Sequence, residues 1–191
     1  MKNYKSIIPL SLIVVLFLSA TAGCKKNSKD TPIVHAIGDS FQGGRVAYIL
    51  QSGDVGFDAN IQHGIIIATT DQSTTVTWGP NSVSLIGTET SVGSGNDNTN
   101  KIVSAFGAGN YAARLCYDLG LNGYTDWYLP SKDELNKLYL NKAAIGGFAN
   151  YRYWASSEDA ISTAWREDMA LGLVAANSRP GLYYVRAVRS F

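Results

Sequence analysis

The pattern of apolar and polar positions from Gly123 to Tyr139 indicates a short aromatic strand, a proline turn and a capped helix. Bulky residues at 127–129 predict a short strand, because aromatic and large apolar side chains pack well on a pleated sheet. Pro130 ends that strand, since proline has no N–H to give to a neighbouring strand. Ser131 and Glu134 have the spacing of a capping box, which pairs free amides at a helix start. The helix that follows has one apolar face, formed by Leu135, Leu138 and Tyr139.

Other apolar and β-branched runs predict further short strands. These runs lie at Arg45–Leu50, Gly64–Thr70, Tyr151–Ser156, Thr163–Leu171 and Tyr183–Phe191. Apolar positions at helical intervals from Ile102 to Leu119 predict a second helical region, which Gly107 and Gly109 divide into two pieces. Asn141–Asn150 and Gly172–Gly181 are expected to be loops. Frequent glycine (19) and tyrosine (11), with only 16% charged residues, favour short strands and tight turns over a helical bundle.

The segment Gly93–Asn100 is rich in glycine, asparagine and other polar residues, whose oxygens are suitable ligands for a cation. However, Asp97 is its only carboxylate, and the segment lacks the ligand spacing of a calcium hand. A turn followed by a helix cap is the preferred interpretation. We therefore predict no metal site.

The N-terminal residues have the pattern of a bacterial lipoprotein signal peptide. Lys2 and Lys5 precede an apolar run at 7–18, which is shorter than the ~20 residues that span a membrane. The sequence TAGC at 21–24 resembles a lipobox, with Thr21 where leucine is usual. We expect residues 1–23 to be removed and Cys24 to carry lipid, including palmitate. The alternative is an ordinary secretory leader.

This interpretation places the mature protein at the cell membrane or outer membrane, facing the surface or the periplasm. Residues 24–36 are expected to be a polar tether, and residues 37–191 the folded domain. Cys116 is then the one cysteine left in that domain, so no internal disulfide is expected. Its apolar neighbours predict a buried, unreactive thiol.

Charge and motif content exclude several classes of function. Residues 1–30 hold five lysines and one aspartate, which leaves 11 basic and 14 acidic residues in 31–191 and a net charge of about −3. Such a domain is poorly suited to nucleic acid. His35 and His63 belong to no catalytic motif, and Ser156 and Ser157 have no base nearby in the sequence. We predict a protein that is not an enzyme and uses no cofactor.

Several motifs occur in order between Ile37 and Phe191: IGDSFQGGRVAYI, HGIIIATTDQSTTVTWG, GTETSVG, NYAARLCYDL, GYTDWYLPSKDELNKLY, YWASSE and YYVRAVRSF. Together they resemble the Lcl C-terminal domain family, which is common in bacterial surface proteins. The resemblance implies an α+β, C-type-lectin-like domain with short antiparallel sheets and two helices. It further implies that the first and last strands pair and that the later strands form a second sheet.

The resemblance also bears on ligands. The type member of the family is a collagen-like adhesin whose domain binds sulfated glycosaminoglycans as a trimer, but no collagen repeat occurs here, so the oligomeric state stays open. Lectins of this fold hold calcium with W-N-D and E-P-N motifs. In this chain Arg166 replaces that asparagine and no E-P-N occurs, so a calcium-bridged sugar site is not expected.

Arginine and aromatic residues are interleaved in 151–191. Arginine matches sulfate and carboxylate geometry, and aromatic faces suit sugar rings. The candidate ligand-binding residues are Arg152, Trp154, Trp165, Arg166, Arg179, Tyr184, Arg186 and Arg189. The alternative is that the tryptophans belong to the core and that the arginines pair with Asp126, Glu158 or Asp168.

The leading hypothesis is a lipid-anchored surface module that binds polysaccharide or glycosaminoglycan in adhesion or glycan capture. The second hypothesis is a protein-interaction or structural module of the cell envelope, with an envelope or host protein as its partner. The net charge of about −3 weighs against strong binding to highly sulfated chains. It leaves neutral glycans and proteins open.

Overall fold

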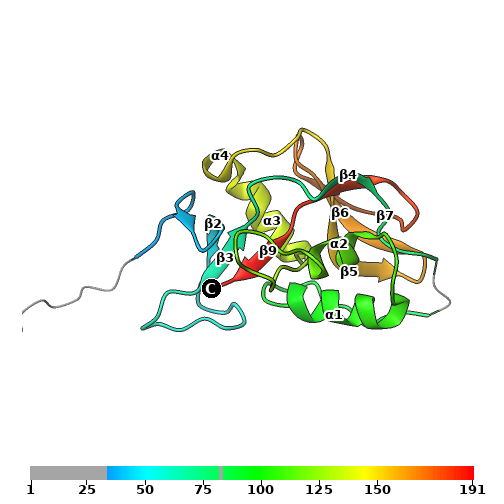
Figure 1. Ribbon diagram of the computed structural model, residues 1–191, viewed down its shortest axis with the longest axis horizontal. Coiled ribbons are helices and arrows are strands. Elements are labelled where there is room, and N and C mark those ends of the chain that lie inside the picture. The colour runs from blue at the N-terminus through cyan, green and yellow to red at the C-terminus, as the bar shows by residue number, and fades with distance from the viewer. Residues whose placement is uncertain (1–33, 82–83) are drawn as a thin grey trace, which may run out of the picture. The chain divides into compact units, whose positions relative to one another are not determined.

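The computed structural model describes residues 34–81 and 84–191 (Figure 1), so the predicted leader, the lipobox and Cys24 lie outside the described residues. Residues 34–191 form one compact unit. Its helices are α1 (Gly95–Phe106), α2 (Ala112–Tyr117), α3 (Lys132–Leu140) and α4 (Lys142–Ile145). Its strands are β1 (Ser40–Phe41), β2 (Gly44–Ile49), β3 (Gly64–Ile67), β4 (Ser73–Val76), β5 (Arg152–Ala160), β6 (Thr163–Asp168), β7 (Leu173–Ser178), β8 (Tyr183–Val185) and β9 (Val188–Ser190).

The strands form two sheets. The first has the order β1-β2-β3-β9 and is antiparallel throughout, and the second has the order β4-β8-β5-β6-β7. Figure 1 shows β9, in red, beside β3, so the end of the chain closes the first sheet. The later strands do make a second sheet, as expected. However, that sheet contains one parallel pair, β5 with β8, and β9 pairs with β3 and not with the first strands.

Helix α3 joins the two sheets, because it packs on β2 of the first sheet and on β5 and β6 of the second. The predicted capping box is present: the Ser131 hydroxyl accepts the Glu134 amide, and the Glu134 carboxylate accepts the Ser131 amide. Leu135 and Leu138 are buried on the face that meets the sheets. This prediction is confirmed. It could be made from the sequence because both hydrogen bonds join residues within one helical turn.

Two tryptophans, Trp78 and Trp154, lie in the larger of the two hydrophobic core clusters. Trp78 donates its indole N–H to the oxygen of Ala155 at 2.7 Å, and Trp154 donates its own to the oxygen of Val76 at 3.0 Å. Both side chains are fully buried. Each indole ring is therefore buried with its N–H group hydrogen-bonded, because a buried N–H without an acceptor would destabilise the fold. Cys116 packs in the same cluster, and burial raises the pKa of its thiol.

Several predicted element types are wrong. Residues 127–129 form no strand, and only Tyr128 makes an isolated bridge, to Val188. Conversely, the expected loop 172–181 contains β7, and helix α1 already starts at Gly95. The described residues contain four helices where two were expected. The helical region around Gly107 is divided into α1 and α2, as predicted, and the expected loop 141–150 contains the short helix α4. No helix in residues 34–81 and 84–191 has the length and apolar content needed to cross a membrane.

Candidate ligand-binding surface

Three of the predicted ligand-binding arginines are buried. Arg179, Arg186 and Arg189 are 0%, 3% and 6% exposed. Each faces a carboxylate: Arg179 lies 2.8 Å from Glu158, Arg186 lies 2.7 Å from Asp71, and Arg189 lies 2.7 Å from Asp126. The partners are far away in the sequence, so these ion pairs connect distant segments. The structure lends no support to the prediction that these three arginines bind ligand, because each guanidinium is buried and already paired.

The same three guanidinium groups also lie over aromatic rings. The ring centroids are those of Trp78 (4.6 Å from Arg179), Phe148 (4.6 Å from Arg186) and Tyr124 (4.0 Å from Arg189). Arg186 additionally donates to the main-chain oxygen of Gly147 at 2.6 Å. A buried arginine needs both a counter-ion and further acceptors to offset the loss of water. These side chains are therefore parts of the fold.

The other predicted residues divide between two faces of the second sheet. On β6, Trp165 and Arg166 are consecutive, so the pleat directs them to opposite faces. Arg166 is paired across the strands with the buried Trp154, but its side chain is partly exposed, and its Nε donates to Asn177 at 2.8 Å. Trp165 lies on the α3 face, half-buried, with the Lys132 ammonium 4.9 Å from its ring. The eight candidates therefore do not form one surface.

A row of aromatic rings lies where β5 begins beside β8. Tyr151 is 46% exposed, and its ring centroid is 5.1 Å from that of Tyr184, which is partly buried. Tyr184 in turn contacts Tyr153 at 5.2 Å in a tilted arrangement, and Tyr153 packs at 5.3 Å on Phe148. We call the outer end of this row, Tyr151 and Tyr184, the tyrosine rim.

The support beneath the tyrosine rim is rigid. Tyr153 is fully buried, and its hydroxyl donates to Asp71 at 3.0 Å and accepts the amide of Ala149 at 2.9 Å. Burial raises the pKa of the Tyr153 hydroxyl, so it stays neutral. Because Asp71 is also the partner of Arg186, one of the buried ion pairs holds the base of the row. A preorganised aromatic surface loses little entropy when a ligand binds.

Arg152 is the least constrained of the predicted arginines. Its Nε lies 3.7 Å from Asp168, and its guanidinium lies 5.9 Å from the ring of Tyr183. The side chain is 44% exposed, so this ion pair is screened by water and holds the guanidinium weakly. Arg152 and Tyr184 were predicted from the sequence. Tyr151 was missed as a site residue, although it stands at the start of the predicted strand YRYWAS.

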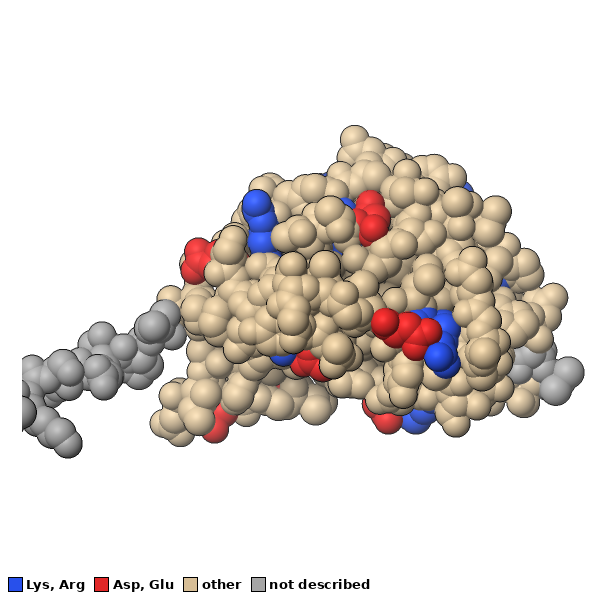
Figure 2. Space-filling view, in the orientation of Figure 1, with Lys and Arg blue, Asp and Glu red and all other residues tan. Residues whose placement is uncertain are grey.

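Charge is sparse on the face drawn in Figure 2, where lysine and arginine appear singly and mostly beside acidic residues. No group of His, Cys, Asp and Glu in residues 34–81 and 84–191 is arranged to hold a metal ion. The recognition chemistry of the tyrosine rim is that of its aromatic rings. Such a surface suits sugar rings with few charged substituents.

The chain matches a family model and is similar to solved structures. The family model described as the Lcl C-terminal domain matches residues 67–189. A fimbrial protein from Bacteroides ovatus ATCC 8483 is similar in structure, with a TM-score of 0.53 and 15% sequence identity. The alignment covers 76% of this chain and 43% of that chain, so the likeness concerns the fold of less than half of the fimbrial protein. No curated protein matches the chain.

Proposed function

Because this chain belongs to the Lcl C-terminal domain family, we propose that it is a surface module that binds glycan through the tyrosine rim, in adhesion or glycan capture. The ligand is a polysaccharide or glycosaminoglycan. The observation that carries the proposal is the exposed Tyr151 against the partly buried Tyr184, which in turn packs on the buried Tyr153. The structural likeness to a fimbrial protein supports a surface role.

The remaining parts of the proposal come from the sequence. The domain is of C-type-lectin-like type, is not an enzyme, and is attached to a membrane through lipid on Cys24. Its net charge of about −3 over residues 31–191 favours neutral or weakly charged glycans over highly sulfated ones. Arg152, next to Tyr151 in the sequence but directed to the other face of β5, is a partly exposed guanidinium that is available for an occasional acidic sugar.

The test is a glycan-array screen of residues 34–191 at two salt concentrations, since these residues form a compact unit with both core clusters. We expect hits on neutral glycans that persist at high salt, because stacking on tyrosine is not screened by ions. Hits confined to sulfated glycans and lost at high salt would move the site away from the tyrosines. A blank array on folded protein would reject glycan binding.

A second function, binding of an envelope or host protein, is favoured by a different region. Strand β7 is an edge of the second sheet, and its register with β6 is regular over all six residues. The β6–β7 hairpin exposes Leu171, Leu173 and Val174, and β7 carries no charged residue. Unprotected edges of this kind can accept a further strand. Loss of a protein partner on Val174→Lys, with glycan binding unchanged, would support this second function.

A further inference from the structure

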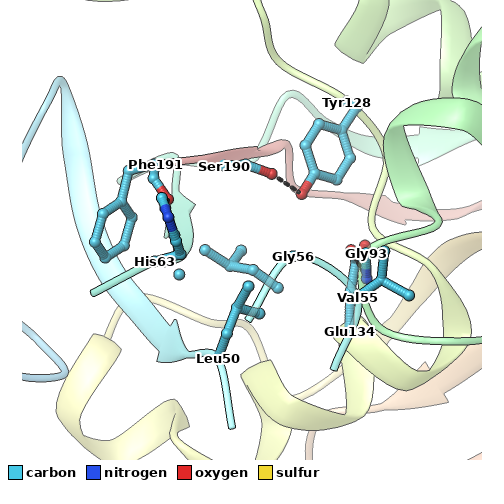
Figure 3. Close-up of a pocket in the computed structure, with 11 residues that line it drawn as sticks. Leu50, Val55, Gly56, His63, Gly93, Tyr128, Glu134, Ser190 and Phe191 are labelled. Carbon is cyan, nitrogen blue, oxygen red and sulfur yellow. Dashed lines mark hydrogen bonds between the residues drawn. The ribbon is translucent and has the colours of Figure 1, made fainter. Parts of the chain in front are cut away.

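A pocket of about 310 Å³ opens at the end of the first sheet, apart from the tyrosine rim (Figure 3). Its walls come from the loop after β2, the start of β3, the turn before α1, and the end of β9. Figure 3 shows Leu50 and His63 on one side of the opening, and Tyr128 and Ser190 across from them. The volume lies at the lower end of the ~300–1,000 Å³ range of small-molecule sites.

Two hydroxyls and one imidazole supply the polar groups of the pocket. Tyr128 and Ser190 share a hydrogen bond of 3.0 Å, which uses one of their two protons. One hydroxyl proton therefore stays available to a ligand, and Ser190 is exposed. His63 Nδ1 lies 3.1 Å from the main-chain oxygen of Phe191, an acceptor, so Nδ1 is a donor in this contact. The second ring nitrogen, Nε2, is then the one that a ligand can contact.

Glu134 is the one acidic side chain among the residues that line the pocket, and its two oxygens already accept hydrogen bonds from main-chain amides. Glu134 is completely buried, and its oxygens accept the amides of Gly93 at 2.8 Å and Ser131 at 2.7 Å. Burial raises the pKa of this carboxyl to about 7, because loss of water outweighs the amide hydrogen bonds. Gly95 lies so close to the carboxylate that no side chain fits there. Glu134 thus fixes the turn before α1 against α3 and offers the ligand no free charge.

The rest of the lining is apolar, and part of it is held in place. Leu50, Val55, Ile65 and Phe191 supply the apolar surface, interspersed with the polar groups. The loop that carries Val55 is fixed by Asp54, whose carboxylate accepts hydrogen bonds from the Tyr48 hydroxyl at 2.7 Å and the Gln51 amide at 2.8 Å. No lysine or arginine lines the pocket. A ligand that fits combines apolar C–H groups with hydroxyls and carries no negative charge.

From this chemistry we propose that the pocket binds one uncharged sugar ring, as a second glycan subsite separate from the tyrosine rim. The ring places its C–H face on Leu50 and Val55 and its hydroxyls on Ser190 and His63. An acidic sugar is disfavoured, since it finds no cation and approaches the buried Glu134 carboxyl. This inference rests on the proposed glycan function for the source of the sugar, but it uses none of the tyrosine-rim residues.

The test is a titration of ¹⁵N-labelled residues 34–191 with methyl glycosides of glucose, galactose, mannose and N-acetylglucosamine, and with glucuronate as the charged probe. We expect at least one neutral glycoside to shift the amides of Gly56, Gly64 and Gly93, which line the pocket, and glucuronate to leave them in place. Ser190→Ala is expected to weaken that binding by about three- to tenfold, the effect of losing one or two neutral hydrogen bonds.

Two further variants keep the test decisive. Val55→Trp fills the pocket from an exposed position, so it is expected to abolish the shifts while the protein stays folded. Ser104→Ala, an exposed serine on α1, is the matched control and is expected to change nothing. The inference is overturned if no neutral glycoside shifts the pocket amides, if glucuronate shifts them equally, or if the shifts survive Val55→Trp.

The same titration separates this inference from the proposed function. Shifts at Tyr151 and Tyr184 without shifts at the pocket would leave the tyrosine rim standing and reject the second subsite. Pocket shifts that persist in Tyr151→Ala, with array binding lost, would support both sites as separate ones. If indole shifts the pocket amides and the glycosides do not, the pocket takes apolar groups and the sugar assignment is wrong.

Discussion

Arginines in residues 151–191 are used in two opposite ways. Arg179, Arg186 and Arg189 are buried between a carboxylate and an aromatic ring, whereas Arg152 and Arg166 lie near the surface of the second sheet. An aromatic residue stands within two positions of Arg152, Arg166, Arg186 and Arg189, though not of Arg179. What separates the two groups is burial. Each buried guanidinium is enclosed with its carboxylate and a ring, whereas Arg152 meets Asp168 of the neighbouring strand and stays 44% exposed.

This difference teaches that arginine density alone does not locate a ligand site in this fold. The buried arginines connect segments that are separate in the sequence, and the tyrosine rim depends on one of them, Arg186, through Asp71. Asp71 therefore contributes both to stability, through its ion pair with Arg186, and to the proposed binding surface, through its hydrogen bond with Tyr153. The predictions below separate the two groups by experiment.

The largest effect is expected for Arg186→Ala. It leaves Asp71 without its partner and frees the main-chain oxygen of Gly147. Removal of one member of a buried ion pair costs about 3–5 kcal/mol of unfolding free energy. Urea denaturation of residues 34–191 measures it, with Arg152→Ala as the matched control that loses only a surface pair. A loss below about 1 kcal/mol in Arg186→Ala would contradict the structural role.

Glu167 is a buried carboxyl with no arginine partner in the described residues, so it can be compared with the carboxylates that pair with the buried arginines. Glu167 is 1% exposed, and in the described part of the chain its Oε1 accepts only Asn136 while Oε2 has no partner. Burial raises its pKa from 4.5 to about 7, so the folded state keeps a proton that the unfolded state releases. Stability is therefore lost as the pH rises from about 4.5 through 7, since the unfolded state then binds fewer protons.

Glu167→Gln removes that pH-dependent cost. We expect the variant to be about 1–3 kcal/mol more stable than wild type near pH 8, with the difference shrinking as the pH falls toward 4. Denaturation at several pH values measures the difference directly. Equal pH profiles for the two proteins would mean that Glu167 is ionised in the folded state at neutral pH.

The double variant Tyr151→Ala, Tyr184→Ala is expected to lose glycan affinity with little change in fold. Each aromatic contact contributes about 0.5–1.5 kcal/mol, so the expected loss is about fivefold or more. Tyr117→Ala is the matched control, because Tyr117 is also 46% exposed and also lies beside an arginine, Arg114. Equal losses in the two proteins would show that the tyrosine rim is not the site.

The smallest effects are expected for Arg152→Ala and Arg166→Ala. Both side chains are partly exposed, so unfolding free energy should change by less than about 0.5 kcal/mol. Arg152→Ala should also reduce binding of acidic glycans at low salt, and the reduction should vanish at high salt because the guanidinium is screened. A salt-independent reduction would point to packing by the Arg152 side chain instead.

The sequence alone reveals the parts of this fold that are local. The capping box of Ser131 and Glu134, the helix after it, and the division at Gly107 all depend on neighbouring residues, and all were predicted. Strand β7 was missed because its sequence, LVAANS, gains its extended form by pairing with β6. Residues 127–129 look like a strand but meet a neighbouring strand only at Tyr128.

The candidate site was predictable only in part. Arg152 and Tyr184 were expected, and the alternative that the other arginines pair with Asp126 or Glu158 is confirmed for Arg189 and Arg179. Which face a residue occupies depends on register between strands that are distant in sequence, such as Tyr153 opposite Tyr184. For that reason a list of arginines and aromatics could not reveal which of them share an exposed surface.

The most direct test of the central claim is to map where a glycan from the array binds, by ¹⁵N amide shifts of residues 34–191. The account predicts shifts at Tyr151, Arg152 and Tyr184, and none at the buried Arg179 or Arg189. Shifts confined to the β6–β7 hairpin, or to the segments around the buried arginines, would contradict a glycan site on the tyrosine rim.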